Sequence, residues 1–206
     1  MSEAPTWDRL ASRYDLASRI FGRSYPAVRR ALARDLAGRE RALELASGTG
    51  QFTLAIAEAV QEVVATDVSI EMVERLRSVV VGHGAEQVSV RRMSAYDIDA
   101  DDQTFDAIVC ANALHVMERP REALAEMHRV VATDGLVIAP TFLHGASWGT
   151  RTLSRLLSAA SPFVAHTRFD MAKLVGLFRT SGFQVVHTET FPGLFPIGYV
   201  VARRPS

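Results

Sequence analysis

Residues 41–57, RALELASGTGQFTLAIA, predict how this chain folds. The stretch begins with a short apolar run at 42–46, which is typical of a buried strand. A turn of small residues follows, SGTG at 47–50, and a pattern of apolar residues typical of a helix comes after it. A buried strand, a tight glycine turn and a helix form the first half of a βαβ unit. The glycines let a ligand lie against the turn, and the new helix offers that ligand free N–H groups and a partial positive charge.

Two classes of ligand use such a turn. Dinucleotide sites prefer G-x-G-x-x-G, with the pyrophosphate at the helix N-terminus. Gly48 and Gly50 fit this pattern, but Thr53 stands at the third glycine position and Ala46 stands two residues before Gly48. Glu44 lies at the end of the strand, where a carboxylate would repel a pyrophosphate and attract a cationic amine. This favours S-adenosylmethionine (SAM), which carries an ammonium and a sulfonium, although the turn alone fits a plain βα connection equally well.

The composition indicates one globular domain. The chain has 206 residues, of which 48% are hydrophobic and 22% charged, and its net charge is zero. No basic block argues for nucleic-acid binding, and one cysteine, Cys110, leaves neither an intrachain disulfide nor a Cys/His cluster with zinc spacing. No apolar run is long enough to span a membrane, and the first ten residues lack the apolar core of a signal peptide. We therefore expect a cytoplasmic protein without a metal or a nucleic-acid partner.

A second acidic residue ends the next predicted strand. Residues 62–66, EVVAT, form that strand and Asp67 follows it. In a doubly wound sheet the tips of these two strands lie side by side, so Asp67 can accept both hydroxyls of a ribose. The alternative is a solvated turn aspartate. Ser69 can cap the helix that follows, and Glu71 in its first turn suits the helix dipole.

The rest of the chain continues this alternation. Further strands are predicted at 87–92, 105–111, 136–141, 183–190 and 195–203. Pro120 suits the first turn of a helix, Asp134-Gly135 is predicted to be a turn, and Asp170 is predicted to cap a helix that runs to residue 178. The short PGL loop at 192–194 predicts that the last two strands form an antiparallel hairpin.

Two segments lie outside the alternation. Residues 1–38 form a helical cap, in which Trp7 and Tyr14 either pack on the core or act as a flap over a ligand. Residues 142–168 form a lid-like insertion at the carboxyl end of the sheet, with an amphipathic stretch and flanking aromatic residues. The insertion either sets the substrate or is a helix that simply packs on the sheet.

Together these stretches resemble a class I SAM-dependent methyltransferase, in the branch of the ubiquinone/menaquinone-biosynthesis enzymes, over about residues 8–203. LELASGTGQFTLAIA resembles the first SAM motif, with Ala46 in place of its usual first glycine. ATDVSIEMVERLR resembles the second motif, with Asp67 in the ribose-binding position. TFDAIVCANALHVMERPREALAEMHRVVATDGLVI resembles the region from the fourth strand to the fifth. WDRLASRYD resembles the N-terminal segment whose tyrosine, Tyr14 in this chain, closes over SAM.

The resemblance implies an α/β fold for residues 1–206 as a single domain. The sheet would be Rossmann-like, seven-stranded and mostly parallel, with a C-terminal antiparallel hairpin, helices on both faces and an N-terminal helical cap. Members often hold the adenine with an aspartate after the third strand, where this chain has Ser94, so Tyr96 or Asp97 are alternatives. The cofactor-binding residues that the resemblance implies are Tyr14, Glu44, Ala46, Ser47, Gly48, Gly50, Asp67, Val68, Met72, Ser94, Ala95, Tyr96 and Asn112.

The implied activity is methyl transfer from SAM to a small-molecule acceptor, for which the insertion favours an apolar or aromatic compound. Because the sulfonium already activates the methyl group, positioning an acceptor and excluding water account for most of the catalysis. His115 is the candidate general base, with ordering of its loop as the alternative, and His144 and His166 are weaker candidates. A homodimer stays open.

Two other functions also stay open. An NAD(P)-dependent oxidoreductase would need a catalytic pair such as Tyr-x-x-x-Lys, and Lys173 is the only lysine. A SAM-binding protein without activity is compatible with the altered positions Ala46 and Ser94.

Overall fold

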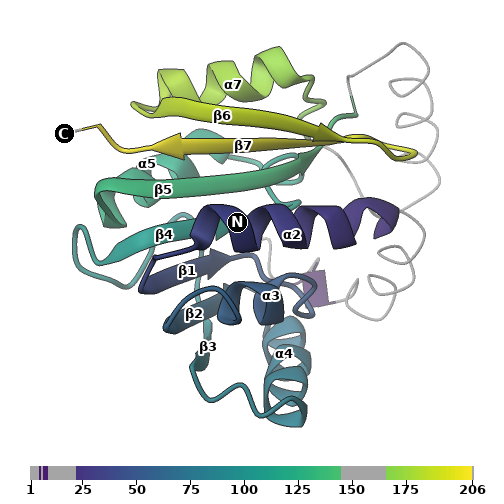
Figure 1. The fold of residues 1–206 in the computed structure, drawn as a ribbon, viewed down its shortest axis with the longest axis vertical. Coiled ribbons are helices and arrows are strands. Elements are labelled where there is room, and N and C mark those ends of the chain that lie inside the picture. The colour runs from purple at the N-terminus through teal and green to yellow at the C-terminus, as the bar shows by residue number, and fades with distance from the viewer. Residues whose placement is uncertain (1–4, 6, 9–21, 145–165, 206) are drawn as a thin grey trace.

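A seven-stranded sheet forms the centre of the computed structural model, which describes residues 5, 7, 8, 22–144 and 166–205 (Figure 1). The strand order is β3-β2-β1-β4-β5-β7-β6. The strands are β1 (Arg41–Leu45), β2 (Glu62–Asp67), β3 (Val88–Arg92), β4 (Phe105–Cys110), β5 (Val131–Phe142), β6 (Gln184–Phe191) and β7 (Ile197–Arg203). The first five strands pair in parallel, while β7 is antiparallel to both β5 and β6. The doubly wound sheet and its C-terminal hairpin are therefore confirmed.

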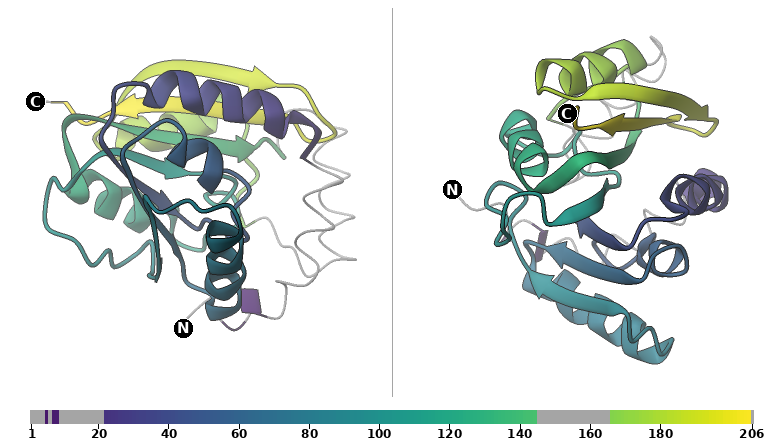
Figure 2. Two further views of the ribbon diagram at one scale, coloured as in Figure 1. Left: turned by 60° about the horizontal axis from the view of Figure 1, so that its bottom comes forward. Right: turned by 60° about the vertical axis from the view of Figure 1, so that its left-hand side comes forward.

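Helices cover both faces of this sheet. They are the 3-10 turn η1 (Gly22–Ser24) and the α-helices α2 (Tyr25–Leu36), α3 (Thr53–Ala57), α4 (Ile70–Gly82), α5 (Pro120–Val130) and α7 (Met171–Thr180). Buried residues of α2, α3 and α4 form one apolar cluster with the sheet, and those of α5 and α7 form the other. Figure 2 shows α2 and α3 on the face opposite to α5.

The helix and strand signals of the sequence act as predicted. Ser69 accepts a hydrogen bond from the backbone N–H of Met72 at 3.2 Å and so caps α4. Asp170 accepts one from the N–H of Lys173 at 2.9 Å and caps α7. The apolar run of β4 is buried on both faces because it lies between β1 and β5. Pro120 begins α5, whose inner face is fully buried.

β5 differs from its prediction because it begins at Val131 and contains the expected turn. Val131 pairs with Phe105 and Leu136 pairs with Ala107, so four residues of β5 stand opposite a single residue of β4. This insertion is a β-bulge in which Asp134 has a φ of +59°. The Asp134-Gly135 signal therefore marks a bulge within a strand, not a turn between two elements.

Parts of two predicted segments lie outside the described residues. They are residues 1–4, 6 and 9–21 of the helical cap, with Tyr14 among them, and residues 145–165 of the insertion. Within the part of the chain that the structure describes, no helix is both long and apolar enough to cross a bilayer.

Candidate functional site

A cavity of about 410 Å³ lies at the carboxyl ends of β1 to β4, within the range of roughly 300–1,000 Å³ typical of small-molecule sites. It is lined by Trp7, Ala46, Gly48, Asp67, Val68, Met72, Met93, Ser94, Ala95, Tyr96, Asp97, Ala111, Asn112, Ala113, Val116, Met117 and Arg119. Apart from Trp7, these residues lie at or after the ends of four neighbouring strands, whose order brings their tips to one edge. The strand order thus brings nine of the predicted cofactor-binding residues to the cavity. They are Ala46, Gly48, Asp67, Val68, Met72, Ser94, Ala95, Tyr96 and Asn112.

The turn after β1 approaches the cavity with its backbone. Ala46 and Gly48 both line it, and both have left-handed φ values, +53° and +56°. A Cβ-free Gly48 leaves room for a ligand against the main chain, whereas Ala46 carries its methyl group in a conformation that favours glycine. The replacement of the family's usual glycine at position 46 has therefore left the left-handed backbone in place.

Two predicted residues of this turn, Ser47 and Gly50, do not line the cavity. Ser47 donates from its backbone N–H and from its hydroxyl to the carbonyl of Thr66, at 2.9 and 3.0 Å. Gly50 has a φ of +90°, and a Cβ there would lie 2.7 Å from Cδ1 of Leu76. Both residues instead fix the turn, Ser47 against β2 and Gly50 against α4.

Asp67 is the buried carboxylate of the cavity. It ends β2, is 7% exposed and accepts hydrogen bonds from the N–H groups of Gly48 and Ser69, both at 2.9 Å. Burial raises its pKa, while these backbone bonds oppose the shift. A carboxylate has about four lone-pair positions, so the backbone donors leave Asp67 capacity to accept from a ligand hydroxyl.

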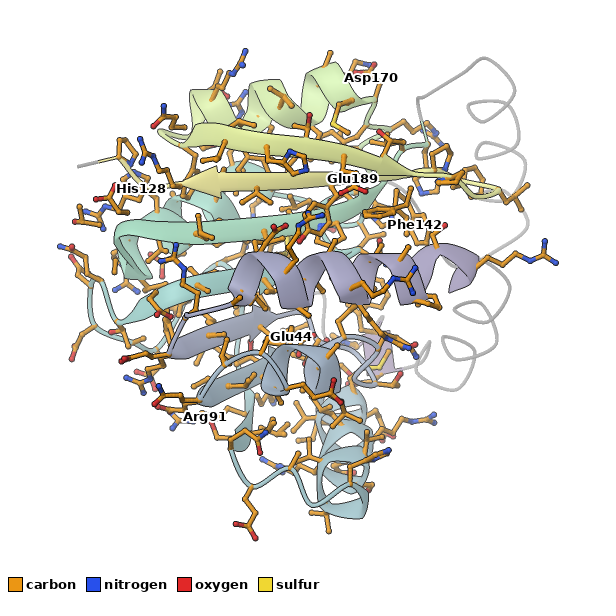
Figure 3. The ribbon with its side chains drawn as sticks, viewed as in Figure 1. Glu44, Arg91, His128, Phe142, Asp170 and Glu189 are labelled. Atoms are coloured by element: carbon orange, nitrogen blue, oxygen red, sulfur yellow. The ribbon has the colours of Figure 1, made fainter. Side chains whose placement is uncertain are left out.

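Glu44 is buried behind the turn instead of lining the cavity, which corrects its predicted position. On β1 the side chains alternate, and Glu44 shares the face of Ala42 beneath α3, where Figure 3 labels it. Its Oε2 accepts a hydrogen bond from the hydroxyl of Thr53 at 2.5 Å, and the residue is 1% exposed. Burial, with a contribution from the charge of Asp67, raises the pKa of Glu44 to about 8. Glu44 therefore connects β1 to the start of α3.

The loop after β3 forms the wall opposite the glycine turn. Ser94, in the position of the family's aspartate, accepts a hydrogen bond from the N–H of Tyr96 at 3.2 Å, so its hydroxyl hydrogen stays available to a ligand. The guanidinium of Arg119 lies over the ring of Tyr96, 4.3 Å from its centroid. The backbone N–H of Arg119 also donates to the Tyr96 hydroxyl at 3.4 Å. Ser94, Ala95 and Tyr96 thus line the cavity as predicted, and Arg119 holds the wall in place.

Asn112 closes the cavity at the tip of β4 with a φ of +52°. Its backbone N–H donates to the carbonyl of Pro140 at 2.6 Å, and its Nδ2 donates to the hydroxyl of Tyr25 at 3.1 Å. Burial raises the pKa of Tyr25 to about 12. The Oδ1 of Asn112 is buried and finds no hydrogen-bond partner among the described residues. The site therefore contains an unmatched acceptor beside the cavity.

His115, the predicted base, is not among the residues that line the cavity. It is 6% exposed and packs against Phe142 and His144, with ring centroids 5.7 and 5.0 Å away. Burial and the neighbouring His144 hold the pKa of His115 well below its ordinary value, so its ring is neutral at pH 7. Its carbonyl accepts a hydrogen bond from the N–H of Thr167 at 3.0 Å. The alternative, that His115 orders its loop, agrees with this geometry.

The N-terminal segment contributes a residue that the motifs did not mark as cofactor-binding. Trp7 lines the cavity, and the carboxylate of Asp8 beside it accepts a hydrogen bond from the hydroxyl of Ser69 at 2.5 Å. The functional alternative for Trp7, a flap over a ligand, thus agrees with its position. Arg119 also lines the cavity and was not predicted, because nothing in the sequence except its place before Pro120 marked it as a site residue. In the ranges that the structure describes, no group of three His, Cys, Asp or Glu side chains could hold a metal.

Comparison with known proteins gives one consistent family. Residues 42–135 match the family described as "Methyltransferase domain". The demethylmenaquinone methyltransferase of Renibacterium salmoninarum is 29% identical over 175 residues, covering 79% of this chain and 68% of that protein. The uncharacterized methyltransferase YcgJ of Bacillus subtilis is 35% identical over 95 residues, covering 46% of this chain and 38% of that protein, well under half of its length. The chain is thus similar to the class I SAM-dependent methyltransferases.

The chain also has the fold of these methyltransferases. A crystal structure of a SAM-dependent methyltransferase from Aquifex aeolicus superposes with a TM-score of 0.73 at 18% identity, covering 96% of this chain and 98% of that one. The similarity to SAM-dependent methyltransferases supports S-adenosylmethionine as the cofactor. An NAD(P)-dependent oxidoreductase finds no support in these comparisons.

Proposed function

We propose that this methyltransferase transfers the methyl group of SAM to a small-molecule acceptor, in a single domain. The observation that carries the proposal is the position of Asp67, a buried carboxylate held by two backbone N–H groups at the edge of the cavity. The cavity volume of about 410 Å³ suits a cofactor of this size. A bound SAM would supply a methyl group that its positive sulfur already activates.

The lining residues divide into groups that match the parts of the cofactor. Asp67 would accept the two ribose hydroxyls, and Gly48 would let the ligand approach the backbone of the turn. Ser94 and Tyr96 would border the adenine, with one hydroxyl hydrogen of Ser94 in place of a charged contact. The unmatched Oδ1 of Asn112 would accept a hydrogen bond from the ammonium of the methionine end.

Positioning is the main catalytic task that these residues can perform. His115 lies outside the cavity lining and is neutral at pH 7, so the site supports orientation of the acceptor and exclusion of water over proton transfer by this ring. Correct orientation alone is worth up to about 7–11 kcal/mol of a reaction barrier. An acceptor that loses its proton to solvent before transfer would need no base from the protein.

The affinity for S-adenosylhomocysteine, measured by calorimetry, tests the proposal. Asp67→Ala removes the acceptor of two ribose hydrogen bonds, each worth about 1.5–3 kcal/mol, so we expect affinity to fall about 100-fold or more. Asp99→Ala, an exposed carboxylate of a neighbouring loop outside the cavity, is the control and should bind as the wild type does.

A thermal-shift series on the wild type keeps the test valid if Asp67→Ala fails to fold. Ligand at about 100 times its Kd adds roughly 2.7 kcal/mol of stability, which corresponds to a Tm rise of roughly 5–10 °C for a chain of this size. We expect this rise with SAM and S-adenosylhomocysteine and not with NAD or NADP. A rise with the nicotinamide cofactors alone would refute the proposal, as would wild-type affinity in Asp67→Ala.

A further inference from the structure

Three basic side chains lie near the ends of β4 and β5, and each has a buried nitrogen atom without a hydrogen-bond partner among the described residues. They are His115 and His144, through Nδ1, and Arg168, through Nε, with no hydrogen-bond partner in the part of the chain described. The rings of the two histidines lie 5.0 Å apart, and the charge of Arg168 acts on His144. The three residues come from three separate segments, so no local turn or helix cap explains their meeting. We call them the basic cluster.

Aromatic rings surround the basic cluster. The ring of Phe195 lies 4.5 Å from that of His144, and the ring of Phe142 lies 5.7 Å from that of His115, centroid to centroid. Figure 3 labels Phe142 at the end of β5. A flat aromatic ligand would find edge and face contacts with these rings.

The basic cluster lies beside the cofactor cavity. His115 belongs to the same loop as Asn112 and Val116, which line the cavity at the tip of β4. His144 follows β5, the next strand of the sheet. A molecule in the basic cluster would therefore lie next to the β4 end of the cavity, where Asn112 would border the methionine end of the cofactor.

The unmatched atoms are groups that can donate hydrogen bonds to an anion. A buried donor without an acceptor destabilises the fold, so three of them in one place are costly unless a ligand accepts from them. Burial and the neighbouring positive charge lower the pKa of His144 to about 4, and the pKa of His115 is lowered in the same direction, so both rings are neutral at pH 7. Each ring can donate one hydrogen bond through Nδ1 in the tautomer that carries its proton there. Arg168 supplies a positive charge in a geometry that suits a carboxylate.

We propose that His115, His144 and Arg168 bind the carboxylate of an aromatic acceptor beside the cofactor cavity. The inference rests on the proposed methyl transfer, because it assigns the acceptor to a carboxylate-bearing aromatic compound. In this proposal His115 positions the acceptor and does not act as a base. Its burial beside the cavity is compatible with that role.

The test is a titration of the full chain with benzoate and with benzamide, which has nearly the same shape and no charge. Both titrations are followed through the histidine ring signals in NMR spectra, with and without saturating S-adenosylhomocysteine. We expect benzoate to shift the signals of His115 and His144 saturably, and benzamide to leave them in place. The exposed His83 and His187 serve as internal references.

Two variants assign the binding to the basic cluster. Arg168→Met keeps an unbranched apolar stem without the guanidinium and should weaken benzoate binding about tenfold or more, because charge-assisted hydrogen bonds are lost. Arg179→Met, an exposed arginine in the last turn of α7, should bind benzoate as the wild type does. If Arg168→Met does not fold, His144→Phe, which keeps an aromatic ring at that place, should also abolish the shift of His115.

The outcomes separate this inference from the proposed function. S-adenosylhomocysteine binding without a benzoate response would overturn the inference alone. A benzoate response without S-adenosylhomocysteine binding would leave an anion site and overturn the proposed function. Equal shifts with benzoate and benzamide, or wild-type benzoate affinity in Arg168→Met, would also refute the role of the basic cluster.

Discussion

The carboxyl edge of the sheet has two halves that treat buried polar groups in opposite ways. In the half formed by β1 and β2, the carboxyl groups of Asp67 and Glu44 accept hydrogen bonds from protein donors. In the half formed by β4 and β5, the basic cluster retains buried nitrogen atoms without partners among the described residues. Satisfied groups stabilise a backbone shape before any ligand arrives, whereas unsatisfied groups reduce stability until a ligand completes them. The first half is thus built in advance, and the second half depends on what binds there.

The pH dependence of stability tests the satisfied half and has the largest expected effect. The folded-state pKa of Glu44, about 8, lies above its ordinary value of 4.5, so the folded protein favours the protonated form. The resulting stabilisation is fully present below about pH 4.5 and is lost as the pH rises through about 8, a change of the order of 4 kcal/mol. The variant Glu44→Gln is neutral at every pH and lacks this loss.

Urea unfolding of the wild type and of Glu44→Gln between pH 5 and pH 8 measures this difference. Other titrating groups are common to both proteins, so the stability of the wild type relative to the variant should fall steadily with pH. Glu58→Gln, an exposed carboxylate at the end of α3, should run parallel to the wild type. A difference between wild type and Glu44→Gln that does not change with pH would show that Glu44 is ionised in the fold.

The two halves also differ in how far the sequence could predict them. Asp67 lies two residues from Ser69 and at a fixed place in the βαβ unit, so local motifs identified it together with the turn at 47–50. The direction of Glu44 depended on the face of β1 that α3 covers, and a motif does not contain that information. For Glu44 the sequence located the residue but not its environment.

The basic cluster could not be predicted from the sequence, because its three residues are far apart in the chain and meet only in the fold. His115, His144 and Arg168 are brought together by the pairing of β4 with β5 and by the return of the chain after the insertion. The sequence therefore offered His115 and His144 only as isolated candidates for a base, and their contact became visible through the fold. The sheet order and the helix caps were predictable because they depend on periodicity and on residues three apart, which a single sequence contains.

Two substitutions, each removing one polar group from one half, should change the free energy of unfolding in opposite directions. Thr53→Val keeps the shape of the side chain but removes the donor to Glu44, so we expect the free energy of unfolding to fall by about 1–3 kcal/mol. His144→Phe keeps the contact with Phe195 and removes a buried atom that has no partner in the described structure, so we expect the free energy of unfolding to rise by about 1 kcal/mol. Denaturant unfolding without ligands at pH 7 measures both changes. A loss of stability in His144→Phe comparable to that in Thr53→Val would mean that the nitrogen of His144 is satisfied in solution.

The smallest expected effect concerns the backbone of the satisfied half. Ala46 has a φ of +53°, and a left-handed conformation costs a residue with a Cβ about 1–2 kcal/mol. Ala46→Gly removes this strain but adds about 0.5–1 kcal/mol of unfolded-state entropy, so the net gain should be about 0.5–1 kcal/mol and a Tm rise of roughly 1–4 °C. Gly50→Ala is the matched variant with the opposite expected effect. An alanine at position 50 would have a φ of +90°, and its Cβ would lie 2.7 Å from Cδ1 of Leu76, so this variant should lose stability. A lower Tm in Ala46→Gly would mean that the methyl group of Ala46 stabilises the turn more than its conformation strains it, and the chain would then have gained from replacing the family's glycine.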